Sequence, residues 1–120
     1  MNINAIDGFL FRIKEIEQQY RKTKSIEELT NNLLNFASEY SGFFGIGDYL
    51  LNMGEEYISN GNYQVGIVMI QTVDQHFPLV ANKTLLNLRM AEYHIDNNEI
   101  ELGIQYLVKL CSAVSNYEES

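Results

Sequence analysis

Three side chains suited to metal binding or nucleophilic chemistry are spread along this chain of 120 residues: His76, His94 and Cys111. A zinc site combines several histidine or cysteine ligands, often at short spacings, and neither histidine has such a partner nearby in the sequence. A cysteine nucleophile needs a neighbouring base, and the sequence places no histidine next to Cys111. We therefore expect no metal and no other cofactor. We interpret His94 as a packing residue and Cys111 as a small buried one.

Acidic pairs and a glycine-rich stretch are the other patterns that could support catalysis. Glu55-Glu56 and Glu99-x-Glu101 place carboxylates one or two residues apart, and residues with that spacing on a helix do not face each other. The segment SGFFGIG at 41–47 lacks the Lys-Ser/Thr end of a phosphate-binding loop and follows no predicted strand. We predict that the protein is not an enzyme, and we keep an enzymatic role as the least favoured class.

Charge is distributed unevenly along the chain. Residues 1–24 carry five basic and three acidic side chains, whereas residues 25–120 carry three basic and thirteen acidic ones, and the overall net charge is −8. The acidic part should repel nucleic acids and anionic membranes and attract a basic protein. The alternative is that these carboxylates only keep the protein soluble.

The length of the chain suits one domain spanning residues 1–120. No apolar run approaches the ~18 residues that a membrane-spanning helix needs, and the N-terminus does not have the pattern of a signal peptide. A single cysteine cannot form an internal disulfide, which is consistent with a reducing compartment. These patterns predict a cytoplasmic protein.

Apolar residues recur at helical spacing along the whole chain, which predicts an all-α protein. One example is the face formed by Leu29, Leu33 and Phe36, which follows the capping-box sequence Ser-Ile-Glu-Glu starting at Ser25. Asn82 has the residue type of a second N-cap. The six predicted helices cover approximately residues 3–22, 26–40, 48–59, 63–75, 82–95 and 100–114.

Residues that form turns separate these helices. Asn60-Gly61 can close a helix with a left-handed residue, and Pro78 cannot continue one. The glycines between residues 41 and 47 predict a loop. We expect Phe43 and Phe44 in that loop to fill the seam between neighbouring helix pairs.

A self-similarity with a period of 37 residues relates the six helices as three hairpins. Within each set of matching positions the residues have a similar character, which is a ring, a turn residue, a helix start or an apolar packing residue. They are Tyr20/Tyr57/His94, Lys24/Gly61/Asn98, Ile26/Tyr63/Ile100, Leu29/Gly66/Gly103, Leu33/Ile70/Leu107 and Phe36/Val73/Leu110. A fixed period of this length is typical of stacked helical hairpins. We place the units at about 3–43, 47–80 and 82–117.

The middle unit resembles the tetratricopeptide repeat (TPR). The residues that carry the resemblance are Met53-Gly54, Tyr57, Gly61, Tyr63, Gly66 and Pro78. The third unit lacks the proline, the first has Glu17 where a small residue is expected, and the period is 37 residues where the family's is 34. The resemblance implies a divergent TPR-like, right-handed stack of three antiparallel hairpins. The alternative is a different six-helix bundle.

The TPR resemblance also implies specific contacts in the middle hairpin. Gly54 and Gly66 should face each other where the two helices approach. Tyr57 and Tyr63 should be buried between the helices as wedge residues, not exposed as ligands.

The resemblance further implies a concave groove lined mainly by the first helix of each hairpin. The groove that clamps a peptide carboxylate in TPR proteins uses Lys and Asn at positions where this chain has acids, which disfavours such a clamp and favours a basic ligand. An exposed tyrosine could act as an aromatic anchor among these residues. The predicted partner-binding residues are Asp48, Tyr49, Asn52, Glu55, Glu56, Glu92 and Asp96.

Size, acidity and the absence of a catalytic motif make the chain similar in broad character to small bacterial immunity proteins of contact-dependent inhibition toxin systems. No sequence motif carries that similarity. It implies a monomer that forms a 1:1 complex with a basic toxin domain, such as a nuclease, and blocks its active cleft. The alternative is a TPR-like adaptor or secretion chaperone that binds a client segment.

Overall fold

Six helices and no strand occur in the part of the chain that the computed structural model describes, which is the backbone of residues 3–119 and the side chains of residues 8–112. The helices are α1 (Ile3–Thr23), α2 (Ile26–Tyr40), α3 (Ile46–Ser59), α4 (Tyr63–His76), α5 (Lys83–Asp96) and α6 (Ile100–Glu119). The all-α prediction is confirmed. Most predicted helix ends agree within two residues, whereas α6 continues beyond its predicted end at 114. The side chains of 113–117, the end of the predicted third unit, lie outside the described residues.

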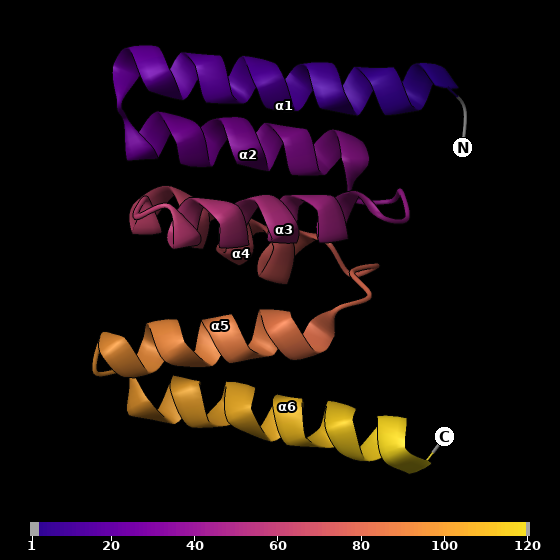
Figure 1. The fold of residues 1–120 in the computed structure, drawn as a ribbon, viewed down its shortest axis with the longest axis vertical. Helices are drawn as coiled ribbons and strands as arrows, with labels where there is room; N and C mark the ends of the chain where they lie inside the picture. Colours follow the sequence, from indigo (N-terminus) through magenta and orange to yellow (C-terminus); the bar gives the residue numbers. More distant parts are fainter. Residues whose placement is uncertain (1–2, 120) are drawn as a thin grey trace.

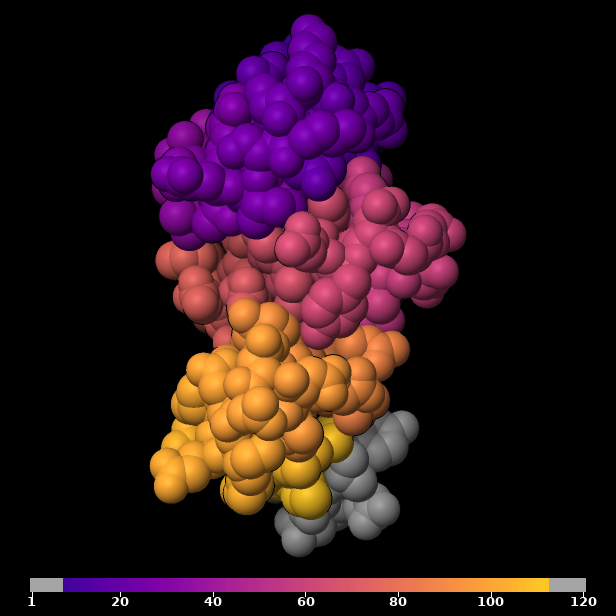
Figure 2. Space-filling view, turned by 90° about the vertical axis from the view of Figure 1, so that its left-hand side faces the viewer, coloured from indigo at the N-terminus to yellow at the C-terminus, as the bar shows by residue number. Residues whose placement is uncertain are grey.

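Consecutive helices pack as three pairs, α1 with α2, α3 with α4 and α5 with α6. In Figure 1 the tight turns within the pairs lie along the left side of the molecule, and the longer connections between pairs lie along the right side. In Figure 2 the pairs follow one another along the longest dimension of 40 Å. Helix α4 packs against α2, α3 and α5, which explains why every residue from Val65 to Ile70 is buried.

The turns within the three pairs repeat one backbone conformation, which confirms the 37-residue period. Lys24, Gly61 and Asn98 have φ angles of 56°, 89° and 62°. Each is followed two residues later by the first residue of a helix. Left-handed backbone is uncommon for residues with a Cβ, so its occurrence at Lys24 and Asn98 reflects a turn geometry that all three pairs require.

Backbones touch where α3 and α4 cross, as the sequence predicts for Gly54 and Gly66. A Cβ atom on Gly66 would lie 2.5 Å from the carbonyl oxygen of Gly54 and 2.5 Å from Cγ1 of Ile58. The third pair repeats the arrangement, because a Cβ on Gly103 would lie 2.5 Å from Cγ1 of Ile95. In the first pair the matching position is Leu29, and α1 and α2 pack less closely.

The two predicted N-caps are confirmed, with one difference. The Ser25 Oγ accepts a hydrogen bond from the Glu28 backbone N–H at 3.1 Å, and the Asn82 Oδ1 accepts one from the Leu85 N–H at 3.2 Å. In a capping box the Glu28 carboxylate would also accept from the Ser25 N–H. Here the Ser25 N–H donates to the Thr23 Oγ1 instead, at 3.2 Å. The Glu28 carboxylate instead accepts from Gln19 at 3.1 Å and links α2 to α1.

The prediction for Phe43 and Phe44 is wrong. Phe44 is 70% exposed and Phe43 is 40% exposed, because the connection between α2 and α3 that carries them lies outside the helix pairs. The seam is filled instead by Phe36 of α2 and by Phe77, which directly follows α4. Both are almost completely buried, and their ring centroids are 6.3 Å apart.

The two tyrosines of the middle hairpin differ from each other. Tyr57 is half-buried, and its hydroxyl donates a 2.6 Å hydrogen bond to the Glu17 carboxylate, which joins α3 to α1. Tyr63 is 43% exposed, so its prediction as a buried wedge is wrong. Its position as the first residue of α4 leaves one side of the ring facing a cleft between α2, α4 and α5.

We predict that Gly66→Leu destabilises the protein by at least the ~1–3 kcal/mol typical of overpacking, because backbone atoms of α3 block the added side chain. Thermal and urea unfolding followed by circular dichroism measure the effect. The control is Gly42→Ala, where an added Cβ would meet no atom within 4 Å. Equal melting of Gly66→Leu and the wild type would show that the α3–α4 register is wrong.

Alkaline pH should destabilise the protein through Tyr57. Burial and the hydrogen bond to Glu17 raise the pKa of Tyr57 to about 12, whereas a tyrosine in an unfolded chain ionises near pH 10. The stability that Tyr57 contributes is therefore complete below about pH 10 and is lost as the pH rises to about 12. In urea unfolding across this range, Tyr57→Phe should lose stability less steeply than the wild type. Identical slopes would contradict the assignment.

Candidate partner-binding surface

The predicted partner-binding residues lie on α3 and α5, the first helices of the second and third pairs. We call this set the α3–α5 face. It contains Asp48, Tyr49, Asn52, Glu55 and Glu56 from α3, and Glu92 and Asp96 from α5. Asp48 and Glu55 are partly buried and bind other parts of the protein, whereas the other five side chains are exposed to solvent.

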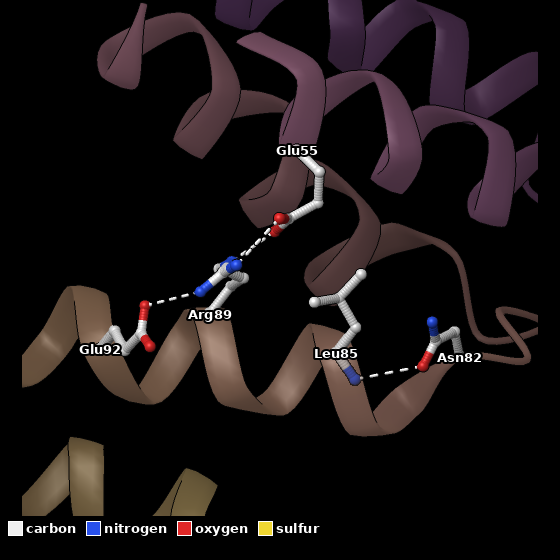
Figure 3. Close-up of polar contacts among 5 residues, drawn as sticks. All are labelled: Glu55, Asn82, Leu85, Arg89 and Glu92. Carbon is white, nitrogen blue, oxygen red and sulfur yellow. Dashed lines mark hydrogen bonds and ion pairs between the residues drawn. The ribbon is translucent and has the colours of Figure 1, made fainter. Parts of the chain in front are cut away.

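Glu55 belongs to an ion-pair network that joins α3 to α5 (Figure 3). The Arg89 guanidinium donates to both Glu55 oxygens, at 2.5 Å and 3.0 Å, and to the Glu92 carboxylate at 2.9 Å. The hydrogen bond with Glu55 is the main cause that raises the pKa of Arg89 and keeps it charged. Glu55 is therefore already neutralised by Arg89. Sequence reasoning did not reveal the contact between Arg89 and Glu55, which are 34 residues apart.

Asp48 holds the connection between α4 and α5 in place. One carboxylate oxygen accepts from the backbone N–H of Ala81 at 3.1 Å and from that of Asn82 at 3.0 Å, and the other accepts from Ala81 at 3.0 Å. Asn82 in turn caps the first turn of α5 (Figure 3). Asp48 thus fixes the start of α5 relative to α3, and its carboxylate has partners within the chain.

The other three α3 residues are exposed. Tyr49 is 41% exposed, and one edge of its ring packs against Phe9 of α1 with ring centroids 5.5 Å apart. Asn52 and Glu56 are exposed as well. A partner could therefore reach all three side chains without displacing the core.

Tyr63 extends the α3–α5 face toward α5. Burial raises the pKa of its hydroxyl, and the nearby charges of Asp96 and Glu92 raise it further. Both of these carboxylates are exposed. An exposed aromatic ring of α4 thus lies near two acids of α5, and sequence reasoning missed this proximity.

A cleft of about 490 Å³ lies beside Tyr63. Tyr63 of α4 and Tyr93 of α5 line its sides, and Ile67 and Val68 are buried beneath it. Its rim is polar and includes Asn97. The sequence shows only that Tyr63 and Tyr93 are aromatic. No local pattern predicts that the two rings line the same cleft.

Comparison of the chain with known protein families, curated proteins and solved structures finds no match. The α3–α5 face must therefore be interpreted from its own geometry. Among the described side chains, no group of three histidine, cysteine or acidic residues could hold a metal ion. None of the helices, over the residues described, is both long and apolar enough to cross a membrane.

The residues first considered for chemistry have ordinary surroundings. His94 is a packing residue, as predicted, with its ring stacked on Tyr106 at a centroid distance of 5.4 Å. Its Nδ1 lies 3.0 Å from the Glu99 carboxylate. Cys111 is exposed, so its prediction as a small buried residue is wrong.

The Glu55–Arg89 pair should contribute more to stability than the looser pair between Arg12 and Glu39. The Glu55 and Arg89 side chains are only 20% and 29% exposed, whereas those of Arg12 and Glu39 are 36% and 49% exposed and meet in one 3.3 Å contact. We predict that Glu55→Gln lowers the free energy of unfolding by about 1–2 kcal/mol, between the values typical of exposed and buried pairs.

The matched control is Glu39→Gln, which should cost less than about 1 kcal/mol because exposed pairs contribute little. Urea unfolding at low and high salt gives both values. Equal small losses for the two variants would mean that the Glu55–Arg89 network does not hold α5 to α3.

Proposed function

We propose that this protein neutralises a basic protein partner by covering its active cleft with the α3–α5 face, and that the partner is a toxin domain such as a nuclease. The observation that carries the proposal is the set of exposed carboxylates on α3 and α5, which are Glu56, Glu92 and Asp96. Glu56 and Asp96 form no ion pair with any described side chain. Glu92 shares Arg89 with Glu55 and is 51% exposed. These carboxylates are available to a cationic surface.

Contacts within the protein reduce the set of residues that we propose as partner contacts. Asp48 and Glu55 are committed to the α4–α5 connection and to Arg89, so their main role is to position the surface. The remaining contacts would come from Tyr49, Asn52, Glu56, Glu92 and Asp96, and Tyr63 adds a second aromatic side chain. Tyrosines are frequent anchors of protein interfaces because a large ring is buried at a small loss of side-chain entropy.

Electrostatics gives a physical reason for a nuclease partner. A nuclease binds a polyanion, so its active cleft is basic, and carboxylates of an inhibitor can occupy the positions of phosphates. Opposite charges also accelerate association. An immunity protein needs such speed because it must act before the toxin causes damage. The proposal includes a cytoplasmic monomer that forms a 1:1 complex.

A second candidate function is that of an adaptor or secretion chaperone with a TPR-like stack. The cleft between Tyr63 and Tyr93 favours it, because a volume of about 490 Å³ can hold an apolar or cationic side chain of an extended client segment. The two functions differ in their response to salt. A toxin inhibitor that relies on charge should associate more slowly as salt rises, whereas binding of an apolar client segment should change little.

Reversing the exposed charges of the α3–α5 face tests the toxin-inhibitor proposal. The variant combines Glu56→Lys, Glu92→Lys and Asp96→Lys. The partner is the protein that co-purifies with tagged wild type from the native cell, which we expect to be basic and to bind 1:1. Stopped-flow association at low salt should be at least about tenfold slower for the variant, within the range that charge steering spans, and the difference should shrink at high salt.

The matched control combines Glu15→Lys, Glu39→Lys and Glu101→Lys, which change the net charge equally at exposed positions outside the face. It should associate faster than the face variant, and circular dichroism should show that both remain folded. Equal rates for the face variant and the wild type, or an acidic natural partner, would refute the proposal.

A further inference from the structure

A second cavity, of about 500 Å³, lies where the α4–α5 connection meets α5 and α6. Phe77, Pro78 and Val80 of that connection line it, and Figure 1 shows the connection on the side opposite the turns within the pairs. Phe77, Val80 and Leu86 belong to the buried core and form apolar walls, and Val108 of α6 is 59% exposed beside them. Its volume and its mixture of apolar walls with a few polar groups are typical of sites for small molecules.

Asn87 is the unusual residue of this cavity. It occupies a position of α5 where the helical pattern calls for an apolar side chain, and it is only 8% exposed. No hydrogen bond joins its amide to another described residue, and its amide atoms are not sealed from solvent as the Arg12 Nε is. Its amide can therefore bond to water in the cavity, and a ligand there can replace that water and take over its hydrogen bonds.

Two lysines line the same cavity. Residues 25–120 contain three basic side chains, Lys83, Arg89 and Lys109. Arg89 is bound by Glu55 and Glu92, and the other two both contribute to the cavity. Lys83 is also the first residue of α5, where the helix dipole favours an anion. The basic side chains of an otherwise acidic region are thus concentrated beside Asn87.

One acid in the cavity limits the charge that it can accept. The Asp74 carboxylate accepts a 2.6 Å hydrogen bond from the Tyr106 hydroxyl, and the Lys109 ammonium lies 4.5 Å from the centre of the Tyr106 ring. Among the lining residues that the structure describes, Lys83, Lys109 and Asp74 together carry a net charge of +1. That charge matches a single carboxylate better than a doubly charged phosphate ester.

We propose that this cavity binds a small carboxylate with an apolar body. The Asn87 amide donates a hydrogen bond to the carboxylate, Lys83 and Lys109 neutralise it, and Phe77, Val80 and Leu86 pack against the apolar part. Asp48 holds the α4–α5 connection from the other side, so the wall that contains Val80 is fixed in advance. Binding at this site does not require that the α3–α5 face binds a protein partner.

Titration with sodium octanoate at constant ionic strength, followed by amide NMR spectra, tests the site. Octanoate should shift the signals of Lys83, Asn87 and Lys109 saturably, with a dissociation constant in the millimolar range or below. Octan-1-ol has the same apolar body without the charge, and sodium acetate has the charge without the apolar body. Each should bind at least about tenfold more weakly, because it lacks one of the two interactions that the cavity offers.

Variants separate binding from folding. Asn87→Leu should abolish octanoate binding yet melt near the wild-type temperature, because the amide forms no hydrogen bond with another described residue. Lys83→Gln combined with Lys109→Gln should weaken binding about tenfold or more, since charge-assisted hydrogen bonds are the strong ones. The control combines Lys14→Gln with Lys22→Gln on α1, at the opposite end of the stack, and should bind like the wild type.

Three outcomes would overturn the proposal. The first is the absence of saturable octanoate shifts in the cavity, and the second is equal binding of octan-1-ol, which would make it an apolar pocket only. The third is a lower melting temperature of Asn87→Leu with octanoate binding retained, which would make Asn87 a structural residue. All three can be observed whether or not the protein binds a basic partner.

Discussion

The close approach of α3 and α4 at Gly54 and Gly66 is the constraint on which the rest of the structure depends. Because backbone meets backbone at that crossing, α4 lies deep enough to be covered by α2, α3 and α5 together, and its side chains supply the central core. The third pair repeats the crossing at Gly103. The first pair, with Leu29 at the matching position, stays more open. The stack is therefore tightest in the middle and at the α5–α6 pair.

The features that the sequence predicted are those determined by local chemistry. The turns at Lys24, Gly61 and Asn98 could be placed because a 37-residue period aligned residues of similar type, and the structure shows the same left-handed backbone at all three. The N-caps Ser25 and Asn82 act within three residues of themselves. Such interactions depend only on neighbours in the chain, so a single sequence is sufficient to find them.

The features that sequence reasoning missed depend on how the helix pairs pack against one another. Asp48 binds backbone groups 33 and 34 residues away, and Glu55 binds Arg89 across 34 residues. No local pattern distinguishes these acids from Glu56, which stays exposed. Phe44 was expected to fill a seam between pairs, and the TPR resemblance implied that Tyr63 is buried. Burial requires a covering element, and neither position has a complete one. The α3–α5 face could thus be located approximately, whereas the roles of its members required the three-dimensional arrangement.

The two seams between the helix pairs differ in chemistry, which makes the cooperativity of unfolding depend on the solvent. Aromatic contacts, Phe9 with Tyr49 and Phe36 with Phe77, and the hydrogen bond from Tyr57 to Glu17 join the first pair to the second. The Glu55–Arg89 ion pair and hydrogen bonds to Asp48 and Asp74 add to the packing that joins the second pair to the third. Units of a helical stack contact only their neighbours and can open separately. Salt weakens ion pairs more than aromatic packing, so high ionic strength should weaken the coupling of α5 and α6 to the rest of the stack more than the coupling of α1 and α2.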